Sequence, residues 1–145
     1  IEINRTQPLR VITIVKKKLD DLQKKNISIL GLSFKPGTDD MRNAVSITII
    51  KKLITLKAKI KVYDPIAMKN AKRIFGNSIQ YSKNPVDCIK NADCCILVTE
   101  WSEFKNLKPQ DFVKQMNRPL LIDGRRLYEK SIFQKYLEYN AIGLS

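Results

Sequence analysis

The fold is decided by the stretch Ile27-Ser28-Ile29-Leu30-Gly31-Leu32-Ser33-Phe34-Lys35-Pro36-Gly37-Thr38-Asp39-Asp40-Met41-Arg42, which leads into a helical pattern near Ser46. Its first seven residues form a short apolar run with branched side chains, which is typical of a buried strand. After Ser46, apolar residues recur at helical spacing with lysines between them. Strand, loop and helix in this order predict the first unit of an α/β fold, with Ser46 as the N-cap of the helix.

The same alternation continues to the end of the chain. Apolar runs predict strands at 27–33, 59–63, 79–81, 94–99, 120–122 and 141–144. Helical spacing predicts helices after Ser46 and at 67–75, 85–90, 109–116 and 128–139. The inward side chains expected for the last helix are Ile132, Phe133, Tyr136 and Leu137. The chain is therefore predicted to form a Rossmann-like parallel sheet of about six strands with flanking helices.

A further helical pattern, at 8–25, precedes the first strand and opens with Pro8. We expect it to form a helix that links this domain to something upstream. The sequence begins with Ile1 and not with methionine. This start favours a chain that was cut from a longer polypeptide.

The composition favours one domain with anionic partners. Lys and Arg number 27 against 14 Asp and Glu, which gives a formal net charge of +13 with no histidine. The basic residues are dispersed, so no single run marks a nucleic-acid-binding arm. Solvated helix faces and strand ends are the simpler reading of most of them.

The three cysteines, Cys88, Cys94 and Cys95, form no CxxC pair, and without histidine no metal site is expected. Cys94 and Cys95 lie in an apolar run, which predicts buried, unreactive thiols. No apolar run approaches the roughly 20 residues of a membrane span, and no leader pattern opens the sequence. We therefore expect a cytoplasmic protein with no membrane partner.

The loop after the first strand is the most informative one, because ligands of doubly wound sheets bind beyond the carboxyl ends of strands. It lacks GxGxxG: Lys35 and Pro36 stand where a second glycine would let the backbone approach a pyrophosphate. It offers an aromatic ring, a lysine, two carboxylates and an arginine within nine residues. The simpler readings are Phe34 as core, the two aspartates as caps, and Lys35 and Arg42 as surface charge.

Residues 31–42, GLSFKPGTDDMR, resemble the opening of the C-terminal domain of the UDP-glucose and GDP-mannose dehydrogenase family, whose usual form is GxxFKxxTDDxR. Two further stretches agree in order: Thr99-Glu100-Trp101 with Phe104, and Asp123-Gly124-Arg125. Asn4-Arg5 with Gln7-Pro8 is similar to the end of that family's central helical region. The resemblance implies that 1–25 end a central linking or dimerisation helix and that 26–145 form the C-terminal nucleotide-sugar (UDP) binding domain.

Roles for individual residues follow from the same resemblance. Phe34 and Lys35 match positions that contact the UDP-sugar, and Arg125 matches an arginine that reaches the nucleotide-sugar, for which a guanidinium is well suited. Arg42 matches an arginine that approaches the nicotinamide end of NAD. Four neighbours are expected to support these groups: Asp39, Asp40, Glu100 and Trp101.

The resemblance also implies an NAD-dependent oxidation of UDP-glucose to UDP-glucuronate, a precursor of polysaccharides. The family's nucleophilic cysteine lies in a segment ending in PKD, and none of the three cysteines here has such neighbours, so no catalytic residue is expected in this chain. NAD would be held mainly by an N-terminal domain outside it. The implied partners are UDP-sugar, the N-terminal and central domains of the same enzyme, and further copies in a homo-oligomer. The chain alone is expected to be inactive.

Two departures from the family pattern bear on the site. Asn43-Ala44-Val45 stands where many members have Glu-Ala-Pro or Glu-Ser-Pro, so the helix entry that aims Arg42 can differ. Arg126 is asparagine in many bacterial members, so the role is placed on Arg125.

Three alternatives stay open. The charge favours a stand-alone basic module that binds nucleic acid or another polyanion, although no platform of interleaved aromatic and basic residues supports nucleic acid. TDDMR and TEWSEF lean towards UDP-glucose, but UDP-N-acetylhexosamine or GDP-mannose remain as substrates. The segment can also serve mainly as an assembly interface through the helix at 8–25.

Overall fold

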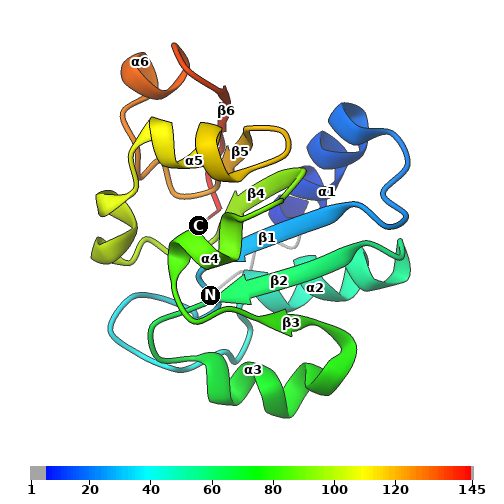
Figure 1. Cartoon of the computed structure of the whole chain (residues 1–145). Coiled ribbons are helices and arrows are strands. Elements are labelled where there is room, and N and C mark those ends of the chain that lie inside the picture. Colours follow the sequence, from blue (N-terminus) through cyan, green and yellow to red (C-terminus); the bar gives the residue numbers. More distant parts are fainter. Residues whose placement is uncertain (1–5, 145) are drawn as a thin grey trace.

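The fold is described by a computed structural model, which covers residues 6–144. The strands are β1 (Asn26–Leu30), β2 (Lys59–Tyr63), β3 (Gln80–Tyr81), β4 (Cys94–Leu97), β5 (Leu120–Asp123) and β6 (Glu138–Ala141). The α-helices are α1 (Thr6–Leu19), α2 (Val45–Thr55), α3 (Met68–Phe75), α4 (Pro85–Ile89), α5 (Pro109–Gln115) and α6 (Lys130–Phe133). Two short 3₁₀ helices, η1 (Gly76–Ser78) and η2 (Ser102–Asn106), complete the secondary structure (Figure 1).

The six strands form one parallel sheet in the order β3-β2-β1-β4-β5-β6, which confirms the predicted Rossmann-like fold. The chain moves from β1 outward to β3, crosses back through α4, and continues from β4 outward to β6. The order therefore reverses between β1 and β4. In doubly wound sheets, this reversal opens a crevice at the carboxyl ends of the two central strands.

Both faces of the sheet are covered, which explains why the central strand β4 is continuously apolar and buried, whereas β2, nearer the edge, alternates between lysine and apolar residues. Side chains alternate between the faces: Ile27 and Ile29 join one hydrophobic cluster, whereas Leu30 joins the other. The first cluster packs under α1, α2 and α3, and the second under α4, α5 and α6. In Figure 1, α4 lies in front of the sheet and α2 behind it.

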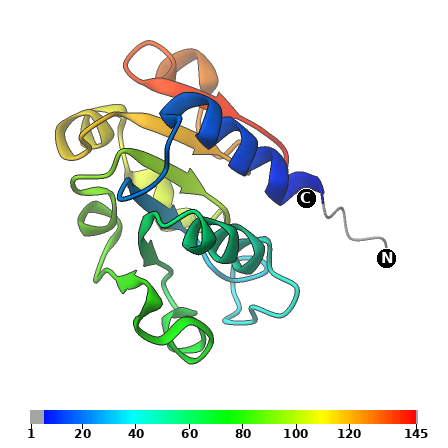
Figure 2. The ribbon, with the colours of Figure 1, turned by 90° about the vertical axis from the view of Figure 1, so that its right-hand side faces the viewer.

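The helix before β1 packs on this domain. Val11, Ile12 and Val15 of α1 are buried in the same cluster as α2, and the two helices lie side by side in Figure 2. The pattern at 8–25 overestimates the helix at its end, because α1 stops at Leu19 and Asp20 takes a left-handed conformation. None of the helices in residues 6–144 has both the length and the apolarity to cross a membrane. Asn4 and Arg5 lie outside the described residues.

Ser46 is not the N-cap of its helix, so that prediction was wrong. α2 begins at Val45, and its N-cap residue Ala44 makes no side-chain capping bond. The hydroxyl of Ser46 is buried and instead donates to the carbonyl oxygen of Leu32, at 2.6 Å. A serine at the start of a helix is a cap only when its side chain turns back to the helix. Here it ties α2 to the loop after β1.

The C-terminal region also differs from the prediction of a helix at 128–139 and a strand at 141–144. α6 covers only Lys130–Phe133, and β6 already begins at Glu138. Phe133 and Leu137 are buried as predicted, but Ile132 and Tyr136 are 43% and 54% exposed. The alternation of Leu137, Tyr139 and Ala141 has the period of a strand. Because residues 138–141 pair with β5, they form a strand and not a helix.

Candidate functional site

The loops that follow the strands meet at the carboxyl edge of the sheet. Residues 31–44 follow β1, 98–108 follow β4 and 124–129 follow β5. β1 and β4 are hydrogen-bonded neighbours, so the first two of these loops flank the point where the strand order reverses. The first loop contains Phe34, Lys35 and Arg42, and the third contains Arg125.

The loop after β1 is a closed turn with outward side chains. The N–H of Phe34 donates to the carbonyl of Asp40 at 2.7 Å, and the Ser33 hydroxyl donates to the carbonyl of Lys35 at 2.9 Å. These two bonds close the loop on itself through its backbone. The side chains of Phe34 and Lys35 face solvent, and Phe34 is 53% exposed. An exposed phenyl ring beside an ammonium group can contact a base or sugar and a phosphate together.

A buried carboxylate at the end of β2 holds the loops in place. Asp64 is 1% exposed. Its two oxygens accept five hydrogen bonds of 2.7–3.1 Å, from the N–H groups of Leu32, Ser33, Ile66 and Ala67 and from the indole N–H of Trp101. Bonds from so many donors stabilise a charged carboxylate away from water. Asp64 therefore joins the loops after β1, β2 and β4 at the base of the site.

The loops after β1 and β4 touch directly. The Thr99 hydroxyl donates to the carbonyl of Ser33 at 2.8 Å. Gly31 lies against Thr99 so closely that a Cβ on Gly31 would sit 2.5 Å from the Thr99 backbone nitrogen. Gly31 also has φ +94°, in the left-handed region that favours glycine. The glycine is thus required both for the turn and for the contact.

Arg125 is fixed at its Nε, and its side chain is 18% exposed. Its Nε–H donates to the carbonyl of Val98 at 2.9 Å, and its Nε lies 3.7 Å from Glu100. The buried Asp123 accepts from the Arg125 backbone N–H at 3.1 Å and from the Tyr139 hydroxyl at 2.6 Å. Within residues 6–144, the two terminal guanidinium nitrogens of Arg125 make no hydrogen bond. They are available to an anion.

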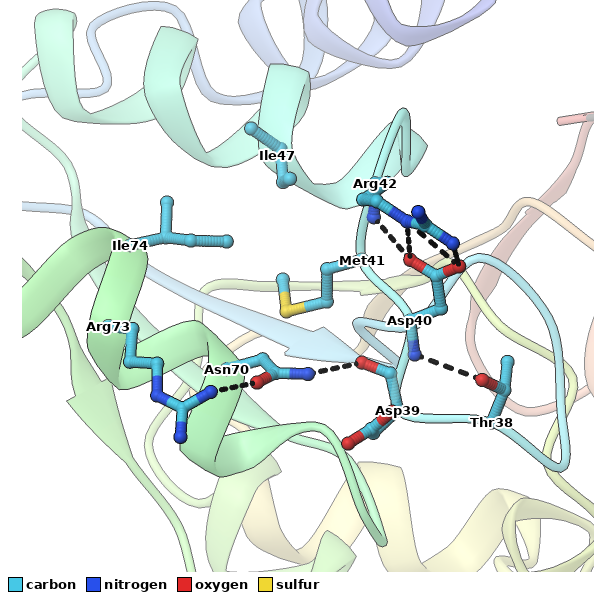
Figure 3. Close-up of a pocket in the computed structure, with 9 residues that line it drawn as sticks. All are labelled: Thr38, Asp39, Asp40, Met41, Arg42, Ile47, Asn70, Arg73 and Ile74. Carbon is cyan, nitrogen blue, oxygen red and sulfur yellow. Dashed lines mark hydrogen bonds and ion pairs between the residues drawn. The ribbon is translucent and has the colours of Figure 1, made fainter.

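Arg42 occupies a different part of the edge, where it lines a groove of about 650 Å³ between its loop and α3 (Figure 3). Its guanidinium donates to both oxygens of Asp40, with the Nη2–Oδ2 distance at 2.9 Å. This contact holds the pKa of Asp40 at about 2, well below its usual value, so Asp40 remains charged at neutral pH. Asn70 closes the base of the groove by donating to the carbonyl of Asp39 at 2.8 Å.

The candidate residues therefore fall into two groups. Phe34, Lys35 and Arg125 belong to loops that hydrogen bonds connect, through Val98 and the neighbouring Thr99. Arg42 lies in the groove beside α3, and its side chain is 88% exposed. Asp40 orients Arg42, as the resemblance implies.

Asp64 and Asp123 were not predicted as site residues from the sequence, where Asp123 stands out only as part of a family motif. Each is an acidic residue at the carboxyl end of a buried strand, directly before a proline or glycine. That position is the available signal, because a carboxylate there must be either a ligand group or a structural acceptor for loop N–H groups.

The cysteines do not belong to the site. All three are fully buried, and burial raises the pKa of the Cys88 thiol to about 12 and raises the pKa values of Cys94 and Cys95 as well. A nucleophilic cysteine needs an accessible position and a lowered pKa. Within residues 6–144, no cluster of three or more potential metal ligands occurs.

These cysteines give a direct test of the fold. We expect no reaction of native protein with a thiol reagent such as DTNB at pH 8, because burial protects each sulfur and keeps it protonated. In denaturant all three thiols should react. Rapid labelling of the native protein at Cys94 or Cys95 would contradict the buried position of β4.

The edge is poorly suited to a dinucleotide. Loops that bind pyrophosphate use glycines for close backbone approach, whereas this loop has Lys35 and Pro36 there. The acidic residue that usually binds the adenosine ribose follows β2. Here that residue is Asp64, which is buried and already accepts five hydrogen bonds. The residues present do not fit NAD at this switch point.

The fold and the site together define a Rossmann-like domain whose carboxyl edge does not fit a dinucleotide. Comparison with known proteins gives its family. The profile described as "UDP-glucose/GDP-mannose dehydrogenase family, UDP binding domain" matches residues 28–130. This chain belongs to the UDP-glucose/GDP-mannose dehydrogenase family and corresponds to its UDP binding domain.

Relatives of this family cover the whole chain. This chain is 34% identical over 144 residues to a UDP-glucose 6-dehydrogenase of Bacillus subtilis. It is 36% identical over 146 residues to a UDP-glucose 6-dehydrogenase of Rickettsia conorii. Both matches cover 99% of this chain, but 33% and 34% of the relatives. The chain therefore spans about a third of the length of these relatives.

Solved structures agree with the fold. A UDP-glucose dehydrogenase from the hyperthermophilic archaeon Pyrobaculum islandicum matches with a TM-score of 0.80 at 26% identity, over 97% of this chain and 30% of that one. A UDP-D-ManNAc dehydrogenase from Pyrococcus horikoshii matches with a TM-score of 0.73 at 21% identity, over 94% and 30%. The second likeness supports the fold alone.

Proposed function

We propose that the carboxyl edge of the sheet binds the UDP part of a UDP-sugar through Phe34, Lys35 and Arg125. The observation that carries this proposal is Arg125, whose Nε donates to Val98 while its two terminal nitrogens make no hydrogen bond within residues 6–144. A guanidinium positioned in this way can donate two parallel bonds to phosphate oxygens. Lys35 adds a second positive charge, and the Phe34 ring adds an apolar surface for the base or sugar.

In this proposal the chain acts within a longer cytoplasmic enzyme that oxidises UDP-glucose to UDP-glucuronate with NAD, for polysaccharide synthesis. The names of the Bacillus subtilis and Rickettsia conorii relatives support UDP-glucose as the sugar nucleotide. The oxidation requires an N-terminal NAD-binding domain, a nucleophile outside this chain and a central helical region, with α1 as the end of that region. Assembly into a homo-oligomer belongs to the same proposal.

Arg42 has a separate role in this scheme. Its position on the groove beside α3 places it at a distinct end of the carboxyl edge, and Asp40 fixes its guanidinium. We assign it to the nicotinamide end of NAD held by the N-terminal domain. It is therefore expected to contribute to turnover of the whole enzyme and little to the affinity of this chain for UDP.

The test is the affinity of this chain for UDP, measured by isothermal titration calorimetry. Arg125→Gln is expected to weaken binding by about 10- to 100-fold, since charge-assisted hydrogen bonds contribute about 1.5–3 kcal/mol. Lys35→Gln should weaken it less, because Lys35 is solvent-exposed and ordered by no side-chain contact within residues 6–144.

Two matched variants serve as controls. Arg126→Gln removes the same charge from the adjacent, exposed position, and Lys83→Gln removes a lysine from another loop of the same edge. Both should change the affinity less than about twofold, because screening weakens contacts of exposed charges with a distant ligand. Equal losses for Arg125→Gln and Arg126→Gln would overturn the assignment of Arg125.

A further inference from the structure

The net charge of the chain is concentrated at the edge of the sheet opposite the UDP site. The connections at the amino ends of the strands (16–26, 51–61, 72–80, 87–93, 114–119 and 134–138) contain 16 of the 27 Lys and Arg but five of the 14 Asp and Glu. The connections at the carboxyl ends (31–44, 64–67, 82–84, 98–108 and 123–129) contain seven of each sign. The charge of +13 therefore does not serve the nucleotide site.

Two of the amino-end connections are joined to each other. The N–H of Lys24 donates to the carbonyl of Lys57 at 2.9 Å, and the N–H of Lys59 donates to the carbonyl of Lys25 at 2.8 Å. These bonds bring the turn before β1 against the turn before β2. We call the resulting group the lysine edge; its members are Lys16, Lys17, Lys18, Lys24, Lys25, Lys57 and Lys59. Figure 2 is viewed from this side of the molecule.

No member of the lysine edge forms a close ion pair within residues 6–144, although Lys18 attracts the carboxylate of Glu138 at longer range. No carboxylate there lies within 4.0 Å of any of its ammonium groups, since the ion pairs of the described residues involve Arg42, Arg118 and Arg125. Asp21 is nearby in sequence, but its carboxylate accepts from the N–H of Gln23 at 2.9 Å. All members are exposed except Lys25, which is half-buried.

Part of this charge has a local explanation. Lysines in the last turn of a helix stabilise its dipole, which accounts for Lys16, Lys17 and Lys18 at the end of α1. It does not account for Lys24, Lys25 and Lys59, which belong to no helix. Lys24 and Lys57 also have φ values of 64° and 62°, where glycine or asparagine is more favourable. Lysines placed together in this way repel one another unless an anion faces them.

The composition of the lysine edge distinguishes between anionic partners. Of the 16 basic residues in the amino-end connections, 14 are lysines. Lysine lacks the planar guanidinium group with which arginine makes two hydrogen bonds to the edge of a nucleic-acid base. The large hydrophobic side chains exposed in the described residues include none from the two joined turns, so there is no aromatic surface for base stacking and no apolar wedge. Clustered lysines without groups that recognise bases are suited to an anionic lipid surface, which attracts them by charge alone.

We propose that the lysine edge binds the surface of an anionic lipid bilayer. The contact is electrostatic, without insertion, and it leaves the carboxyl edge with Phe34 and Arg125 facing away from the lipid. Binding of lipid and of UDP are therefore independent. The expectation of no membrane partner rested on the lack of an apolar span, which a surface contact through lysines does not need.

The experiment is sedimentation of the chain with vesicles of phosphatidylcholine, with and without phosphatidylserine. The edge variant replaces Lys17, Lys24, Lys57 and Lys59 with glutamine. The matched variant replaces Lys69, Lys83, Lys105 and Lys130, which are exposed elsewhere, and has the same net charge. Phosphatidylserine vesicles should bind the wild-type chain, and the edge variant should lose about tenfold or more in affinity while the matched variant loses about twofold or less.

Raising the salt from about 0.1 M to about 0.5 M should release the wild-type chain, because screening removes a purely electrostatic contact. UDP affinity should be unchanged in the edge variant. The proposal is overturned if the wild-type chain ignores phosphatidylserine, if both variants lose equally, or if duplex DNA competes the chain off the vesicles at equal phosphate concentration. That last result would identify the edge as a nucleic-acid surface.

Discussion

Replacing Asp64 with alanine should lower the free energy of unfolding by about 3–5 kcal/mol, because several buried N–H groups lose their hydrogen-bond acceptor at once. Five donors then lose their acceptor inside the protein, and four of them are backbone N–H groups that cannot turn elsewhere. Each donor left buried without a partner costs about 1–3 kcal/mol, and water entering the space offsets part of the sum. Urea unfolding followed by circular dichroism measures the change.

The control for Asp64→Ala is Asp39→Ala. Asp39 lies in the adjoining loop and is exposed, and in the described residues only its backbone carbonyl takes part in a hydrogen bond. Its loss should change the free energy of unfolding by about 0.5 kcal/mol or less. If Asp64→Ala were no more destabilising than Asp39→Ala, Asp64 would not be the residue that joins the three loops. Asp64→Asn should fall between the two, since it retains one oxygen acceptor.

Replacing Gly31 with alanine should be the other large effect, at about 3 kcal/mol or more. The new Cβ would lie 2.5 Å from the Thr99 backbone nitrogen, so β1 or the loop after β4 must move. A left-handed φ of +94° adds the conformational cost of a non-glycine residue, about 1–2 kcal/mol. The same urea titration measures the loss, and weaker UDP binding should accompany it because the Thr99–Ser33 bond lies at this contact.

Gly37→Ala separates these two causes. Gly37 has a similar φ of +86°, but nothing lies within 4 Å of a Cβ at this position. It should show the conformational cost alone, about 1–2 kcal/mol. Equal losses for Gly31→Ala and Gly37→Ala would mean that the loops after β1 and β4 do not pack as described.

The sequence was sufficient for the architecture because the sheet is buried on both faces. Apolar runs such as 94–97 and 120–122 then have no helical period, and the intervening segments do. The prediction for 128–141 was wrong because the apolar residues there fit both a helix and a strand. The prediction for Ser46 was also wrong, because a serine that begins a helix can bond either to the helix or to a neighbouring loop.

The site was predictable only in part. Phe34, Lys35, Arg42 and Arg125 were found through a family resemblance. The physical features of the loop after β1 alone gave Phe34, Lys35 and Arg42 an equally good simpler reading. Asp64 was missed because its role depends on which loops meet in space. Two of its N–H donors, Leu32 and Ser33, and its indole donor, Trp101, are more than 30 positions away in the sequence. Contacts between loops that are distant in the sequence cannot be predicted from a single sequence.

The most direct test of the central claim is a ¹H–¹⁵N correlation spectrum of this chain titrated with UDP. Binding at the carboxyl edge predicts shifts of the amide signals of Ser33, Phe34, Lys35 and Arg125, with no change at Lys24 and Lys57 on the opposite edge. Shifts confined to the lysine edge, or a spectrum unchanged by millimolar UDP, would contradict a UDP site made by Phe34, Lys35 and Arg125.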